Sequence, residues 1–391
     1  MDIDLPAPSQ NQRMVTVLIN TSRDAADGDY QVANRWADLR RSLQEQSAPA
    51  EVLDQLQERV LEPTGAAGPH GRLLLADPQS GVLVDRVLHE PPRKDDAVWA
   101  AGPNTFAFAR TADSRVRYLL VAADRTGAEL EFVDTASSGS TTESIEGEHN
   151  EITKNRMGGL SHRRIQARAE DSWERNSEQI AEEIDSAARQ FEPELVVLTG
   201  DVRMVTLIGE MASGSIAGLL HPLPGGARSD SADDDSFEQD LQAALDQFRL
   251  RRRQETIDRF AEATGRDSGA VTGLADVLEA LRRGQVAEVL VTPDAVGAAS
   301  RMREQTLWHG PDALQVALDA EGMSEMGVTD PGQGPADVVL GLAAWGSGAG
   351  VALVDEEAVE LTDGIGALLR WDDDSTPGQT AYKLSDDTPR T

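Results

Sequence analysis

Residues 152–168 constrain this chain more than any other stretch. The protein has 68 acidic and 36 basic residues, yet this stretch contains no carboxylate. It includes the glycine pair Gly158-Gly159, after which apolar residues recur every three or four positions as far as Phe191. That spacing is typical of an amphipathic helix of about seven turns. The chain must therefore fold so that a long helix follows directly on a glycine-containing loop.

Basic side chains surround the glycine pair. Arg163 and Arg164 fall in the first turn of the predicted helix, where the helix dipole disfavours cations by about 0.3–1 kcal/mol each. Ser161 is placed to cap that helix. A phosphate from outside the chain would offset the cost, because arginines and the N–H groups at a helix N-terminus both bind it. The stretch therefore predicts a polyanion-binding surface. The alternative is a glycine-rich turn before a surface helix whose arginines are only solvated.

The rest of the chain alternates between strand and helix patterns. Short apolar or alternating runs predict strands at 15–20, 72–76, 81–88, 195–200, 288–292, 351–355 and 365–371. Helical spacing predicts helices at 29–47, 50–61, 237–263, 272–283 and 336–345. Such alternation is typical of layered α/β domains. The polar residues 135–151 contain few apolar anchors and are expected to be mobile.

These patterns predict an α/β protein with three domains. Pro91, Pro92 and Pro103 mark the first boundary. The predicted parts are an N-terminal α/β domain (1–102), a central mixed-sheet domain with the basic Gly-Gly loop and long helix (103–255), a C-terminal layered α/β domain (256–371) and a disordered acidic tail (372–391).

Two motifs resemble one known family. Gly158-Gly159-Leu160-Ser161-His162-Arg163-Arg164 resembles the Gly-Gly-Gln loop and arginine-bearing helix of archaeo-eukaryotic class-1 release factors. Near the other end, Thr362–Trp371 resembles the closing Gly-Ile-Ala-Ala-Ile-Leu-Arg-Tyr strand of release factors and Pelota. The likeness is to the bacterial and archaeal offshoots of this superfamily, which include Balon-like ribosome hibernation factors. It implies that the C-terminal domain (256–371) is a ribosomal-protein-like α/β/α domain that binds a translation GTPase such as elongation factor Tu.

The departures from the family pattern shape the predicted function. Leu160 stands where the family has its catalytic glutamine, and leucine has neither a donor nor an acceptor with which to place water. The Asn-Ile-Lys-Ser motif that reads stop codons is also absent from the N-terminal third. The resemblance therefore implies a factor that enters the ribosomal A site, contacts rRNA at the peptidyl-transferase centre and protects the ribosome under hibernation or stress without terminating translation.

The residues expected to contact rRNA all lie in or beside the Gly-Gly loop. They are Lys154, Asn155, Arg156, Gly158, Gly159, Leu160, Ser161, His162, Arg163, Arg164 and Arg168. No catalytic residue is assigned. Two alternatives stay open: a peptidyl-tRNA hydrolase on stalled ribosomes that uses His162, and an α/β protein whose basic loop binds a phosphorylated small molecule.

Composition excludes several other classes. The net charge of −32 argues against nucleic-acid binding over the whole surface, so DNA is not an expected partner. The absence of cysteine excludes disulfides and thiolate metal sites, and we expect neither a metal nor a cofactor. Gly346–Gly350 follows a helical pattern and precedes a strand, the reverse of a dinucleotide-binding loop. The opening residues lack a signal-peptide pattern and no apolar run approaches membrane-spanning length, so a cytoplasmic protein without a membrane partner is expected.

A second arginine cluster lies on the predicted helix 237–263. It consists of Arg249 and Arg251–Arg253. Arginines beside acidic residues on a helix surface are common and contribute little beyond solvated ion pairs. We therefore interpret this cluster as structural rather than RNA-binding.

Overall fold

The computed structural model describes residues 12–25, 27–66, 68–88, 90–124, 126–135, 140–146, 161–225, 234–266, 268–373 and 376. For 110–112, 114, 140–146, 161–172, 234 and 235 it describes the backbone only. The chain divides into two compact units, one formed by the residues up to Asp113 together with those from Arg253 onward, the other by Ser114–Arg252. Both units are α/β, which confirms the predicted fold class. Within the described ranges, none of the helices combines the length and apolar character that a bilayer-spanning segment needs.

The N-terminal part of the first unit is built on an antiparallel sheet in the order β3-β2-β1-β4. Its strands are β1 (Arg13–Asn20), β2 (Gly71–Asp77), β3 (Gly81–Leu88) and β4 (Asp96–Ala101). The helices α1 (Gly28–Glu45) and α2 (Ala50–Leu61) cover one face, where Trp36 and Leu53 are buried against the strands. The strand, hairpin and helices predicted from the sequence in this region are confirmed.

The C-terminal part of the first unit has three layers. Its sheet runs in the order β10-β16-β11-β15, with β11 and β15 parallel and the other pairs antiparallel. The strands are β10 (Ala270–Thr272), β11 (Val286–Val291), β15 (Gly350–Leu353) and β16 (Ile365–Leu369). The helices α8 (Leu274–Arg282) and α11 (Ala336–Gly346) cover one face, and the C-terminal half of α7 (Asp234–Gly265) covers the other. This is the predicted α/β/α arrangement.

A smaller sheet completes this part, in the order β13-β12-β14. Its strands are β12 (Thr306–His309), β13 (Val316–Ala317) and β14 (Gly332–Pro335). The short helices α9 (Arg301–Glu304) and α10 (Ala320–Glu325) and the 3-10 turn η1 (Thr362–Gly364) join the strands. Asp372 and Thr376, which lie in the predicted tail, hydrogen-bond to Ser268 and Gln285. The domain boundaries predicted at residues 102, 255 and 371 remain a prediction.

Apolar packing joins the N-terminal and C-terminal parts of the first unit. Val98 and Ala100 of β4 form a cluster with Val338 of α11. Phe106, on α3 (Thr105–Ser114), belongs to the C-terminal core that also contains Leu340. Residues that are far apart in the sequence therefore share one interior.

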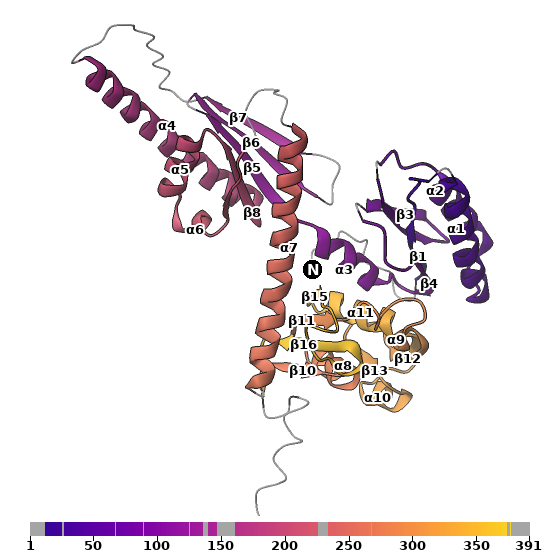
Figure 1. Cartoon of the computed structure of the whole chain (residues 1–391). Coiled ribbons are helices and arrows are strands. Elements are labelled where there is room, and N and C mark those ends of the chain that lie inside the picture. Colours follow the sequence, from indigo (N-terminus) through magenta and orange to yellow (C-terminus); the bar gives the residue numbers. More distant parts are fainter. Residues whose placement is uncertain are drawn as a thin grey trace, which may run out of the picture. The chain divides into compact units, whose positions relative to one another are not determined.

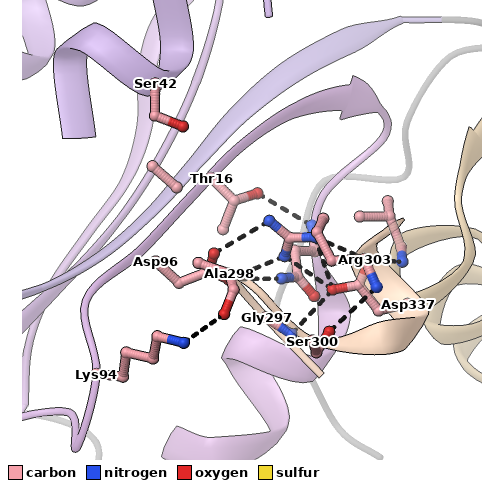
Figure 2. A network of polar contacts seen from close by, with 12 residues as sticks. Thr16, Ser42, Lys94, Asp96, Gly297, Ala298, Ser300, Arg303 and Asp337 are labelled. Carbon is pink, nitrogen blue, oxygen red and sulfur yellow. Dashed lines mark hydrogen bonds and ion pairs between the residues drawn. The ribbon is translucent and has the colours of Figure 1, made fainter. Parts of the chain in front are cut away.

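A buried charged network lies at the same junction (Figure 2). Nη1 and Nη2 of Arg303 donate to the two carboxylate oxygens of Asp96 at 3.0 Å, and Nε donates to Asp337 Oδ2 at 2.8 Å. The side chains of Arg303 and Asp96 are 13% and 10% exposed, and that of Asp337 is fully buried. Burial by itself lowers the pKa of the guanidinium, but the two carboxylates outweigh burial and raise the pKa of Arg303 above its ordinary value. Arg303 therefore stays charged and holds β4 to α11.

The second unit is built on a mixed sheet in the order β7-β6-β5-β8-β9. Its strands are β5 (Arg117–Asp124), β6 (Gly127–Asp134), β7 (Ser140–Glu146), β8 (Leu195–Gly200) and β9 (Leu220–Pro222). β5, β8 and β9 are parallel, whereas β6 pairs antiparallel with β5 and β7. The helices α4 (Ser161–Phe191), α5 (Val202–Met211) and α6 (Gly214–Ala217) cover one face, and the N-terminal half of α7 covers the other (Figure 1).

One expectation about this unit is wrong. The polar segment 135–151 was expected to be mobile, yet Ser140–Glu146 form β7 and pair with β6 along its length. The physical reason is that the backbone groups along the edge of β6 can pair with another strand, and the backbone of the mostly polar residues of β7 supplies that partner although Ile145 is its one apolar residue. Residues 136–139 and 147–151 lie outside the described part of the chain.

The network around Arg303 generates a stability prediction. Arg303→Met leaves two buried carboxylates without their cation, so we expect it to lower the free energy of unfolding by about 3–5 kcal/mol. The matched control is Arg301→Met on the same short helix, where the side chain is exposed and makes no ion pair with a described residue. Urea unfolding followed by tryptophan fluorescence measures both.

A second variant separates charge from packing. When Asp96→Asn and Asp337→Asn are added to Arg303→Met, no uncompensated charge stays buried, and the triple variant should recover part of the lost stability. A triple variant that is less stable than Arg303→Met would contradict the electrostatic explanation.

Candidate functional site

The candidate site predicted from the sequence lies at the N-terminal end of α4. Ser161, His162, Arg163, Arg164 and Arg168 form the first turns of this helix, and their backbone is helical while their side chains lie outside what the structure describes. The other predicted residues, Lys154, Asn155, Arg156, Gly158, Gly159 and Leu160, lie outside the described residues. The predicted long amphipathic helix is confirmed, and the arginines fall in its first turns as expected.

The C-terminal half of α4 anchors the site to the sheet. Ile180 and Ile184 are buried in the core of the second unit. Phe191 stacks on Phe132 of β6, with 4.8 Å between the ring centroids and an angle of 15° between the ring planes. In Figure 1 the N-terminal end of α4 extends beyond the strands that its other end covers. Burial of the C-terminal end of α4 therefore fixes the direction in which its N-terminal end projects.

The start of α5 places an exposed arginine, Arg203, beside α4. Asp201 caps α5 by accepting from the N–H of Arg203, and both Val202 and Arg203 are exposed. The guanidinium carbon of Arg203 lies 5.1 Å from the ring centroid of Trp173 on α4. A guanidinium stacked on an indole keeps its N–H groups at its edge, where they can donate to a phosphate or a carboxylate.

Arg175 on α4 and Arg203 on α5 are exposed cations of the second unit. Neither makes an ion pair with any residue that the structure describes. Towards its C-terminus α4 carries carboxylates from Glu170 onward, so the helix is basic at its beginning and acidic over the rest of its length. Within the sequence of α4, positive charge without carboxylates is therefore confined to the first turns.

Sequence reasoning missed Arg175 and Arg203. Arg175 lies beyond the acid-free stretch, between carboxylates, and gave no separate signal. Arg203 lies just after β8. The sequence pattern predicted this strand, but it could not indicate that the next helix, α5, packs beside Trp173.

The close approach of β8 to β5 fixes the start of α5. Gly200 adopts a φ of +114°, and a Cβ there would collide with the carbonyl oxygen of Ala123. The N–H of Asp201 donates to that same oxygen at 2.9 Å. Glycine therefore lets the chain turn tightly from the sheet into α5 and sets the position of Arg203.

The second arginine cluster is structural, as predicted. Arg252 pairs with Glu194 at 2.9 Å, Arg253 with Asp113 at 2.6 Å and Arg249 with Asp246 at 2.6 Å. The guanidinium of Arg251 lies 5.3 Å from the ring centroid of Phe248. Gly346–Gly350 connects α11 to β15, which confirms the helix-to-strand order that argued against a dinucleotide loop.

Comparisons with known proteins agree with the resemblance in the sequence. The sequence model of "Bacterial archaeo-eukaryotic release factor family 2" matches residues 117–266. Two Mycobacterium tuberculosis proteins, Rv2629 of strain H37Rv and MT2704 of strain CDC 1551, are each 30% identical over 362 residues, which cover 91% of this chain and 92% of the relative. The chain belongs to the bacterial archaeo-eukaryotic release factors, a branch of the release factor and Pelota superfamily.

Solved structures of the superfamily are also similar to the chain. Dom34 of Saccharomyces cerevisiae is 12% identical, with a TM-score of 0.41 and coverage of 78% of this chain and 79% of that chain. Pelota of Archaeoglobus fulgidus is 15% identical, with a TM-score of 0.32 and coverage of 77% and 80%. Because these identities and TM-scores are low, the assignment to the family rests on the match of its sequence model.

A matched pair of glycine substitutions tests the geometry of this site. Gly200→Ala should destabilise the second unit by more than about 1 kcal/mol, because the new Cβ meets backbone and the φ is positive. Gly209→Ala lies within the same α5, where nothing surrounds the new Cβ, and should instead raise stability by about 0.5–1 kcal/mol. Thermal unfolding of both variants measures the difference, and two shifts of the same sign would contradict this assignment.

Proposed function

We propose that this protein binds the ribosome, occupies the A site and contacts the peptidyl-transferase centre in hibernation or stress protection, without stop-codon-dependent termination. The observation that carries the proposal is the combination in the chain itself: an arginine-bearing helix directly after a Gly-Gly loop, with Leu160 in place of the glutamine. The arginine-bearing helix suits rRNA phosphate, and Leu160 lacks the amide group that the family uses for hydrolysis.

The charge distribution supports a local rather than a general contact with RNA. A body with a net charge of −32 repels phosphate over most of its surface. The sequence at the start of α4 contains arginines and no carboxylate, and Arg203 is exposed beside Trp173 of the same helix. An RNA ligand would therefore be bound through this end, with Gly158 and Gly159 allowing close approach of the backbone and Leu160 packing against a base.

The proposal extends to a protein partner. The family resemblance assigns GTPase binding to the C-terminal domain, so we propose a translation GTPase such as elongation factor Tu as a second partner. The C-terminal layers have a packed core and are formed by other residues than the arginine-bearing end of α4. They can therefore bind a partner of their own.

Ribosome binding should depend on the arginines at the start of α4. Arg163→Ala with Arg164→Ala should weaken cosedimentation with ribosomes at least about tenfold and make binding less sensitive to salt, because each lost phosphate contact lowers the salt slope by about one. The matched control, Arg41→Ala with Arg266→Ala, removes the same charge from side chains that are 67% and 65% exposed and that pair with acidic residues three or four positions earlier in the chain. Equal binding of the wild type and the α4 variant would contradict the rRNA contact.

Peptidyl-tRNA should survive contact with the protein. We expect purified protein to leave the ester intact on stalled or terminating ribosomes, since Leu160 cannot orient water. Release of labelled peptide measures this directly. Efficient release that disappears in His162→Ala would instead establish the hydrolase alternative, while ribosome binding in the cosedimentation assay could stay intact.

A further inference from the structure

A groove on the C-terminal part of the first unit lies between α8, β13 and α10, which are neighbours in Figure 1. It encloses about 320 Å³. That volume is at the lower end of the range for ligand pockets, about 300–1,000 Å³. It suits one or two side chains of a partner rather than a large ligand.

The floor of the groove is apolar and fixed. Leu278, Val316 and Ala317 line it, and each is less than a tenth exposed. Leu278 and Val316 belong to the main C-terminal core. Leu318, which is 51% exposed, continues this apolar surface to the rim. The groove is therefore preformed, because its floor is the outer side of a packed interior.

The rim carries three carboxylates, those of Asp319, Glu321 and Glu325, that make no ion pair within the described residues. One of them, Asp319, also caps α10 by accepting from the N–H of Gly322. The basic lining residue, Arg282, is held by Glu279 at 2.8 Å. Glu321 and Glu325 are four residues apart on α10, a like-charge spacing that destabilises a helix by about 0.2–0.5 kcal/mol. A cationic partner would turn this repulsion into attraction.

We propose that this groove binds a protein segment in which an apolar side chain is flanked by lysine or arginine. The apolar floor and Leu318 accept the apolar side chain, and the three rim carboxylates accept the cations. The same carboxylates repel phosphate, so the groove faces a protein and the arginine-bearing end of α4 is the face for RNA. This inference does not require the ribosome-binding proposal.

The test uses the full chain and a synthetic probe. The probe is a fluorescein-labelled helical peptide of leucine and lysine at amphipathic spacing, with a leucine–glutamate peptide of the same length as its negative control. Anisotropy is measured at physiological ionic strength, where a Debye length of about 8 Å screens the general attraction to an acidic body. Glu321→Lys with Glu325→Lys should weaken binding about tenfold.

Matched variants separate the groove from net charge. Glu51→Lys with Glu58→Lys makes the same change in charge on the exposed face of α2 and should weaken binding by no more than about twofold. Leu318→Ser should weaken binding severalfold without changing charge, whereas Leu250→Ser, at a leucine that is 61% exposed on α7, should not.

Hydrogen exchange locates the peptide independently of the variants. Bound peptide should protect residues 274–282 and 316–325. Equal weakening by the two lysine pairs, equal binding of the leucine–glutamate peptide, or protection confined to other segments would overturn the proposal. Because the assay contains no ribosome, its outcome is independent of the rRNA contact.

Discussion

The first unit depends on one buried contact, that of Arg303 with Asp96 and Asp337. A guanidinium in a nearly dry interior is tolerated only when carboxylates satisfy its charge and its directional N–H groups. Here the carboxylates come from β4 and α11. Asp96 on β4 is 207 positions from Arg303 in the sequence. The network therefore requires the N-terminal sheet to meet the C-terminal layers in one register, and the surrounding apolar contacts of β4 and α3 exclude water from it.

This contact joins the two ends of the chain on either side of its central segment. The first unit is assembled from the two ends of the chain, so the residues 114–252 are inserted between two parts that are joined without them. The second unit has its own sheet and its own cores on both faces. The arginine-bearing end of α4 is thus positioned by the second unit alone, through the burial of Ile180 and Ile184 and the stacking of Phe191.

Charge is distributed unevenly between the two candidate surfaces. At the start of α4, arginines in an acid-free stretch suit phosphate, whereas at the groove between α8 and α10, carboxylates that make no described ion pair repel it. Elsewhere many arginines are neutralised by neighbours, as Arg252 and Arg253 are. A strongly acidic protein can in this way keep one face for a polyanion and another for a cationic protein segment, because both contacts are short-ranged at physiological salt.

The sequence by itself determined the elements and the character of the main candidate site. Apolar periodicity predicted α4, α7 and the strands β1, β8 and β11, because burial on one face or on both leaves a repeat that can be read locally. The arginines in the stretch 152–168, which contains no carboxylate, predicted the candidate site. Such a local excess of positive charge can be read directly from the sequence. The strand β7 escaped prediction because its pairing depends on the free edge of β6, not on its own side chains. Only the tertiary structure decided that Arg203 lies over Trp173, that Arg303 joins two carboxylates and that α8 and α10 enclose a groove. Each of these brings together residues that are distant in sequence, and no local pattern encodes such a distance.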